Sequence, residues 1–193
     1  MDVSMAVQHL RAGGIVLYPT DTLWGLGVDA TNVSAIERLR VLKGSEGAKH
    51  YSIVVSDMTM ARQYVDVTPL AERLIKKFLP GKLTIVLESH GLPHELSDNK
   101  TIGIRIPSHP VPLALAKELG RPITSTSANV SGTDGSLTEK VLRENNICVV
   151  GEYKPLLDSA PSTVVDARAA TPIVIREGAI TTSELTDFES GVL

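Results

Sequence analysis

Short apolar runs alternate with segments of helical periodicity along the whole chain. Val3, Ala6, Val7 and Leu10 share one face of a helix predicted over 3–12, and a compact apolar run over 15–18 follows it. Further helices are predicted near 32–43, 58–64, 69–79, 111–119 and 137–145, and strands near 26–29, 52–55, 83–87, 101–106, 147–150, 161–166 and 173–176. Because helices alternate with strands and no internal repeat is visible, the pattern predicts an α/β fold with a mixed sheet.

The segment 101–106 has a clear period of two. Isoleucines at 102, 104 and 106 fall on one face of the predicted strand, which leaves Thr101, Gly103 and Arg105 on the other. A glycine beside an arginine on a strand face permits close approach by an anion or by another backbone. The alternative is a surface arginine, and the local pattern does not decide between the two.

Hydroxyl side chains crowd the segment 122–132, Pro-Ile-Thr-Ser-Thr-Ser-Ala-Asn-Val-Ser-Gly, where a short strand is expected to end. Hydroxyls and backbone N–H groups can surround a phosphate or a carboxylate. On local sequence alone, the commoner arrangement is a turn whose side chains bond their own backbone. Thr20, Asp21 and Thr22 present the same choice, between a turn that Pro19 initiates and a polar rim at a strand end, where open α/β sheets bind ligands.

Composition narrows the function classes. The chain has 193 residues, enough to bury a sizeable core in one domain, and only 4% are aromatic, so the core must be aliphatic. The net charge of −3 argues against a protein that coats nucleic acid. Without a signal-peptide pattern or an apolar run of roughly 18 residues, we expect a cytoplasmic protein that does not enter a membrane. We expect one domain over 1–180 and a polar tail over 181–193 that frays around at most one short helix.

The cysteine and histidine residues do not indicate a disulfide or a metal site. The single cysteine, Cys148, excludes an internal disulfide, and its apolar neighbours indicate a small buried hydrophobe. His90 and His94 have the spacing of metal ligands on a helix, but Gly91-Leu92-Pro93 between them argues against a helix there. No metal site is therefore assigned from the protein's own side chains.

Six short motifs occur in order between Gly13 and Ile180. They are Tyr18-Pro-Thr-Asp-Thr-Leu-Trp-Gly-Leu-Gly27, Pro80-Gly-Lys-Leu-Thr84, Ile102-Gly-Ile-Arg-Ile-Pro107 with His109-Pro110, Ser125-Thr-Ser-Ala-Asn-Val-Ser-Gly132, Pro161-Ser-Thr-Val-Val-Asp166 and Ile175-Arg176-Glu-Gly178. Each alone is weak, but the six in order resemble the YrdC family, the threonylcarbamoyl-AMP synthases of tRNA modification.

The resemblance implies a single-domain YrdC-like fold, in which a twisted mixed α/β sheet with flanking helices surrounds a concave basic cavity. It implies a nucleotidyltransferase that makes threonylcarbamoyl-AMP from L-threonine, bicarbonate and ATP, with Mg²⁺ accompanying ATP, and that releases pyrophosphate. A downstream threonylcarbamoyl transferase would use the product, so contact with tRNA is expected to be indirect. The alternatives are an RNA-binding module without catalysis and a carbamoyl-transfer domain.

The resemblance also assigns roles to residues by matched position. It implies a threonine site made by Thr20, Arg105, Ser125 and Ser162. It implies a nucleotide site made by Lys43, the backbone near Thr101, Ser127 and Arg176, with Asn129 bracing the loop. Lys43 and Arg105 are the expected catalytic residues, because clustered cations stabilise the charge that develops in phosphoryl transfer.

The end of the second predicted helix departs from the family pattern, which usually has Lys-x-Arg. Here the segment is Lys43-Gly44-Ser45, and a serine cannot make the bidentate phosphate contact of an arginine. Our hypothesis is that Lys49, from the polar loop that follows, compensates for the missing arginine.

Overall fold

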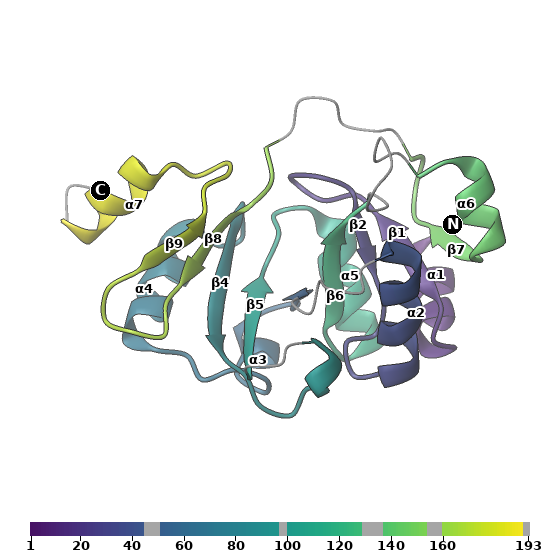
Figure 1. Ribbon diagram of the computed structural model, residues 1–193, viewed down its shortest axis with the longest axis horizontal. Coiled ribbons are helices and arrows are strands. Elements are labelled where there is room, and N and C mark those ends of the chain that lie inside the picture. The colour runs from purple at the N-terminus through teal and green to yellow at the C-terminus, as the bar shows by residue number, and fades with distance from the viewer. Residues whose placement is uncertain (45–50, 97–99, 129–136, 154–159, 191–193) are drawn as a thin grey trace.

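The computed structural model describes residues 1–44, 51–96, 100–128, 137–153 and 160–190. Helices and strands alternate as the sequence predicts, so the α/β class is confirmed (Figure 1). The helical elements are α1 (Val3–Arg11), α2 (Val33–Lys43), α3 (Met58–Ala61), α4 (Pro69–Phe78), the 3₁₀ turn η1 (His94–Leu96), α5 (Pro110–Leu119), α6 (Glu139–Glu144) and α7 (Thr182–Glu189). The strands are β1 (Ile15–Tyr18), β2 (Gly25–Gly27), β3 (Ser52–Val54), β4 (Leu83–Glu88), β5 (Thr101–Arg105), β6 (Ile123–Ser127), β7 (Ile147–Val149), β8 (Thr163–Asp166) and β9 (Ile173–Arg176).

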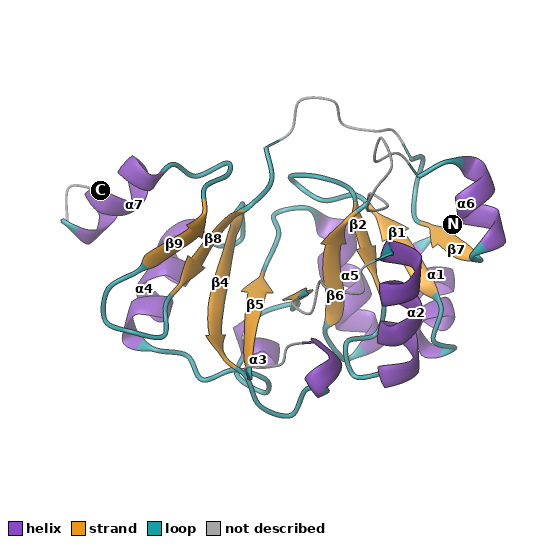
Figure 2. Ribbon diagram, in the orientation of Figure 1, coloured by secondary structure: helices purple, strands orange, loops and turns teal. Residues whose placement is uncertain are grey.

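The described strands form one mixed sheet in the order β7-β1-β2-β6-β3-β5-β4-β8-β9. The pairs β1/β7, β3/β5 and β4/β8 are parallel, and the other neighbours are antiparallel. In the view of Figure 2 the strands cross the middle of the molecule, and α4 and α5 lie behind them. The chain starts beside the β7 edge and ends beside the β9 edge.

The core is aliphatic, as the low aromatic content predicts. Leu17 is fully buried on β1, and Ile53, Ile104 and Ile85 are fully buried on the adjacent strands β3, β5 and β4. Ile104 belongs to the apolar face that the period of two predicts for β5, and this face packs into the core. The opposite face of the same strand is therefore left for a cavity.

Tyr18 explains the two glycines of β2. Its ring is fully buried, and its hydroxyl donates to the carbonyl of Thr124 at 3.1 Å. A Cβ at Gly25 would lie 2.8 Å from the Tyr18 ring, and one at Gly27 would lie 2.9 Å from it and 2.5 Å from the Thr124 carbonyl oxygen. Both positions thus require glycine, and the packed ring fixes the β1–β2 hairpin whose loop carries Thr20.

The C-terminal segment is better ordered than its polar sequence suggests. Thr181 and Glu184 form a capping box at the start of α7, and Leu185 is only 2% exposed. The Phe188 ring meets that of Phe78 edge-on at 5.4 Å. The one short helix that the sequence allowed in this tail is therefore present over 182–189, where an apolar stripe on α7 packs against α4.

The structure also bears on three further questions: the burial of Cys148, a metal site at the histidines, and helices that could span a membrane. Cys148 is 2% exposed in β7, which confirms a buried hydrophobe. In the described ranges no group of three or more His, Cys, Asp or Glu side chains is placed to hold a metal ion, and His90 lies 3.5 Å from Asp66 instead. None of the described helices is long and apolar enough to cross a bilayer.

Candidate functional site

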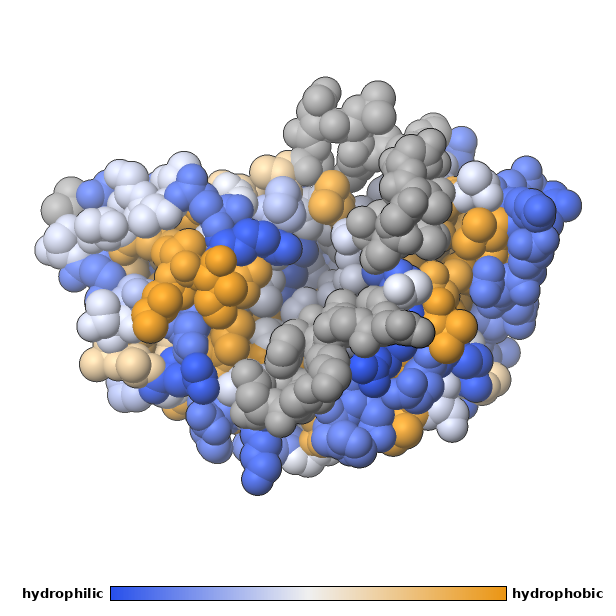
Figure 3. Space-filling view, viewed as in Figure 1, coloured by the Kyte–Doolittle hydropathy of each residue, from blue (hydrophilic) through white to orange (hydrophobic). Residues whose placement is uncertain are grey.

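A cavity of about 490 Å³ opens on the sheet face opposite the buried isoleucines of β5. Its wall comes from the loop between β1 and β2, from the start of β2, and from strands β3, β4, β5, β6, β8 and β9. The space-filling view has a hollow near the middle of this face (Figure 3). Because those strands lie side by side in the sheet, segments distant in sequence contribute to one site.

The floor of the cavity follows the sheet register. Ser52 of β3 lies opposite Ser125 of β6 on one side and opposite Gly103 of β5 on the other. A Cβ at Gly103 would lie 2.8 Å from Cγ2 of Thr84 and 3.2 Å from Cβ of Ser52. The glycine therefore makes room for these two neighbouring side chains, which in turn line the cavity.

Arg105 is a buried member of the cavity wall, at 6% exposure, so the surface-arginine alternative is wrong. Its Nη1 donates to Oγ1 of Thr22 at 2.7 Å, and its Nη2 donates to Oδ1 of Asp21. Nε donates to the carbonyl of Gly81 at 3.4 Å. Burial lowers the pKa of Arg105, and the adjacent Asp21 carboxylate opposes that shift.

The loop after β1 is a hydrogen-bonded turn and also part of the cavity wall. The Thr20 hydroxyl accepts from the backbone N–H of Thr22 at 3.0 Å and donates to the carbonyl of Leu23 at 2.7 Å. Thr20 and Thr22 both line the cavity. The two interpretations of this segment are thus compatible, since the turn itself presents the side chain that holds Arg105.

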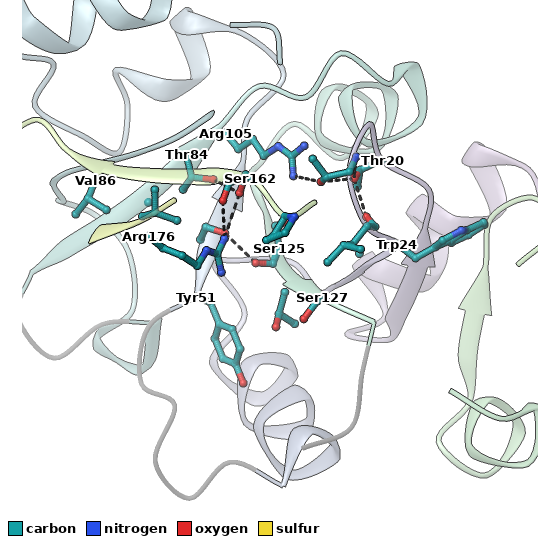
Figure 4. A pocket seen from close by; sticks show the side chains of 18 residues that line it. Thr20, Trp24, Tyr51, Thr84, Val86, Arg105, Ser125, Ser127, Ser162 and Arg176 are labelled. Atoms are coloured by element: carbon teal, nitrogen blue, oxygen red, sulfur yellow. Dashed lines mark hydrogen bonds between the residues drawn. The ribbon is translucent and has the colours of Figure 1, made fainter. Parts of the chain in front are cut away.

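Ser162 and Arg176 form a second polar cluster, across the cavity floor from β6 (Figure 4). The hydroxyls of Ser162 and Thr84 lie 2.9 Å apart. Nη2 of Arg176 donates to the Ser162 carbonyl at 2.8 Å and lies 3.5 Å from the Ser162 hydroxyl. In Figure 4, Arg105 and Arg176 lie on either side of Ser162, so two cations flank one hydroxyl-lined space.

Lys43 approaches the cavity from the last turn of α2. Its Nζ donates to the carbonyl of Ser127 at 2.9 Å, and the residue is only 6% exposed. Burial lowers the pKa of Lys43 to about 8. Lys43 does not itself line the cavity, but it places a positive charge directly behind the end of β6.

The structure brings six of the predicted site residues to this one cavity: Thr20, Arg105, Ser125, Ser127, Ser162 and Arg176. Thr101 is not among the lining residues, because it begins β5 opposite Glu88, at the far end of the strand from Arg105. Ser45, Lys49 and Asn129 lie outside the described residues.

Sequence reasoning assigned no role to several lining residues, namely Trp24, Tyr51, Ser52 and Thr84, whereas Thr22 belongs to the polar rim that it offered as one interpretation. Trp24 contacts the Tyr153 ring edge-on at 5.2 Å. Ser52 and Thr84 each share a strand face with the cavity, so the period of two would have identified them if the neighbouring strands had been known. The described lining contains two arginines and no carboxylate, which agrees with a basic cavity.

Comparison with known proteins identifies the family to which the chain belongs. A family model described as "Telomere recombination", which covers the Sua5, YciO and YrdC proteins, matches residues 8–178. The chain belongs to the Sua5/YciO/YrdC family. Within this family, it is 37% identical over 186 residues to the "Putative threonylcarbamoyl-AMP synthase" of Methanocaldococcus jannaschii, covering 92% of this chain and 86% of that protein.

Other relatives in the Sua5/YciO/YrdC family include proteins without an assigned activity. The chain is 31% identical over 185 residues to the "Uncharacterized protein YciO" of Escherichia coli K12, covering 91% of this chain and 88% of that protein. The crystal structure of P. abyssi Sua5 complexed with L-threonine superposes with a TM-score of 0.84 at 27% identity. That match covers 96% of this chain and 56% of the Sua5 chain, so this chain spans little more than half of Sua5.

Proposed function

We propose that this chain is a nucleotidyltransferase that makes threonylcarbamoyl-AMP from L-threonine, bicarbonate and ATP, with release of pyrophosphate. The observation that supports this proposal is the cavity, in which Arg105 and Arg176 flank the hydroxyls of Ser125 and Ser162. The reaction must bring several anionic groups together, and two arginines in one cavity offset their repulsion. A relative of similar fold has been crystallised with L-threonine.

The threonine side of the proposed site is the Arg105 side. The planar guanidinium of Arg105 suits the carboxylate of an amino acid, because its N–H groups match two carboxylate oxygens. The hydroxyls of Ser125 and Ser162 are the proposed partners of the amino and hydroxyl groups of threonine. The Thr20 hydroxyl is already bonded within its own turn, so its proposed part is to shape the wall that holds Arg105.

The nucleotide side of the proposed site is formed by Arg176, Ser127 and Lys43. Arg176 provides a planar donor set for phosphate oxygens, and Lys43 adds a positive charge through its position behind the Ser127 carbonyl. The described cavity wall offers no carboxylate to hold a metal ion. We therefore assign Mg²⁺ to the substrate, bound to the phosphate oxygens of ATP, where it would neutralise part of their charge.

The chemistry requires no covalent nucleophile from the protein. Bicarbonate takes up a proton and loses water to give carbon dioxide; the neutral amine of threonine then adds carbon dioxide and loses a proton to solvent, which gives a carbamate. A carbamate oxygen then attacks the α-phosphorus of ATP, the bond to the β-phosphate oxygen breaks, and pyrophosphate leaves. The protein contributes orientation, which is worth up to about 7–11 kcal/mol in well-aligned reactions, and a sheltered site that protects the mixed anhydride from water. A separate transferase would then move the threonylcarbamoyl group to tRNA.

The deciding experiment is detection of the adenylate by mass spectrometry after incubation with MgATP, bicarbonate and a panel of amino acids. We expect a threonine-dependent product and matching pyrophosphate release. Arg105→Met should abolish both. Arg62→Met should change neither, because it removes an exposed arginine that is paired with Glu72 and does not line the cavity. Absence of an adenylate with every amino acid would reject the proposal, and salt-dependent tRNA binding without turnover would favour an RNA-binding module instead.

A further inference from the structure

Asp21 lies against Arg105 but does not line the cavity. The two side chains form an ion pair and are both almost fully buried. The second carboxylate oxygen of Asp21 accepts from the backbone N–H of Ser108 at 3.2 Å and from its hydroxyl at 3.0 Å. Asp21 thus ties the loop after β1 to the loop after β5, with the guanidinium between the cavity and the carboxylate.

These contacts fix the orientation of the guanidinium. Asp21, Thr22 and Gly81 each accept from a different nitrogen of Arg105, and they come from two separate segments of the chain. Three of the five guanidinium donors are used in this way, which leaves two for a ligand. A cation held so firmly can accept a planar carboxylate without first being ordered.

The two arginines of the cavity differ in their charge environment. Arg105 is paired with Asp21, so its positive charge is largely balanced within the protein. Arg176 donates to the carbonyl of Ser162, and in the part of the chain that the structure describes no carboxylate forms an ion pair with it. The cavity is therefore more positive on the Arg176 side than on the Arg105 side.

We infer that Asp21 is a positioning and specificity-determining residue, which holds Arg105 in place and keeps polyphosphate away from the Arg105 side of the cavity. A weakly positive, preorganised donor set suits the single charge of an amino-acid carboxylate. The strongly positive side at Arg176 then takes the phosphates, so the charge division prevents the nucleotide from occupying the amino-acid site. The identity of the amino acid rests on the proposed function, whereas the charge division rests on the ion pair alone.

The test uses inorganic pyrophosphate as the probe, with binding measured by isothermal titration calorimetry in the absence of ATP and amino acid. Asp21→Asn removes the negative charge, and we expect about tenfold tighter pyrophosphate binding. Asp21→Glu should bind like the original protein, because it restores the carboxylate. The double variant Asp21→Asn with Arg105→Gln should lose the gain. Asp29→Asn is the matched control, since Asp29 is a buried carboxylate 3.0 Å from Arg121 and outside the cavity.

Kinetics provide a second readout. Asp21→Asn should raise the KM for threonine about tenfold while kcat falls less, and Asp21→Glu should recover most of that loss. Unchanged or weaker pyrophosphate binding in Asp21→Asn, or an equal gain in Asp29→Asn, would overturn the inference. If the original protein forms no adenylate, the proposed function fails, but the pyrophosphate titrations still decide the role of Asp21.

Discussion

Replacing Lys43 by methionine should stabilise the protein while it weakens ATP binding. Lys43 is almost fully buried at the end of α2, and its Nζ donates to the carbonyl of Ser127, a residue that is itself exposed. Methionine has a similar length, fills the same space and carries no charge. The variant thus removes a buried cation together with the hydrogen bond that its Nζ donates to the Ser127 carbonyl.

The size of the effect follows from the pKa of Lys43, which burial lowers from 10.5 to about 8. At 1.36 kcal/mol per pKa unit, the charged lysine costs about 3 kcal/mol in the folded state. Because the folded pKa is depressed, stability should rise with pH between about 8 and 10.5, and the full cost is present below pH 8. Subtracting about 1 kcal/mol for the lost hydrogen bond to Ser127, we expect Lys43→Met to be more stable at pH 7 by up to about 2 kcal/mol, as measured by urea unfolding.

The same pKa predicts the pH dependence of catalysis. The protonated fraction of Lys43 falls from about 0.9 at pH 7 to about 0.1 at pH 9, so kcat/KM for ATP should fall about tenfold over that range. The assay needs saturating threonine and bicarbonate, because carbamate formation has its own pH dependence. Lys43→Arg should flatten this decline, and Lys117→Arg, on the exposed face of α5, should leave it unchanged.

One combination of results would refute the reasoning about Lys43. If Lys43→Met were less stable than the original protein and retained its kcat/KM for ATP, the lysine would serve the fold rather than the nucleotide. A stabilised variant with a loss of at least tenfold in kcat/KM for ATP at pH 7 would agree with a charge that is kept for function at a cost in stability.

Three further predictions test the site and its support. Ser125→Ala should raise the KM for threonine about three- to tenfold, and Ser127→Ala should raise the KM for ATP by a similar factor, as expected for loss of one hydrogen bond. The opposite pattern in steady-state kinetics would exchange the two assignments. Thr163→Val should lower the free energy of unfolding by about 2–4 kcal/mol, as measured with urea. The buried Thr163 hydroxyl accepts from the N–H groups of Gly178 and Ile180 and donates to the Ile180 carbonyl. Thr163→Ser keeps this hydroxyl and should cost much less. Lys49→Ala should reduce kcat/KM for ATP severalfold if Lys49 compensates for Ser45, and unchanged kinetics would reject that hypothesis.

Local features of the fold were predicted correctly from the sequence. The period of two in β5 identified which face enters the core, because burial on one face of a strand imposes that period directly. The start of α4 at Pro69 also agrees with the helix predicted over 69–79, since a proline in the first turn avoids an unpaired N–H group locally. The sequence allowed the short C-terminal helix α7 but did not indicate that Phe188 packs it against Phe78 of α4, because that contact joins distant elements.

Partners across the sheet were beyond the reach of sequence patterns. Arg105 and Asp21 are 84 residues apart, and Thr84 and Ser162 are 78 residues apart, yet each pair forms a direct contact. A strand pattern identifies the face of a side chain but not the neighbouring strand, which depends on the order β6-β3-β5-β4-β8 across the sheet. Only the ordered set of family motifs indicated that these segments meet.

The loop after β1 resolves an apparent choice between structure and function. Its residue types suit a proline-initiated turn, and the Thr20 hydroxyl does bond within that turn. Those same bonds fix the direction of Thr22, whose hydroxyl accepts from Arg105, and they place Asp21 against the other guanidinium nitrogen. A turn that satisfies its own backbone is rigid, and a rigid turn can hold a buried arginine in one orientation for a ligand. The hydrogen bonds that Thr20 makes within its own turn therefore help to build the site and are not evidence against one.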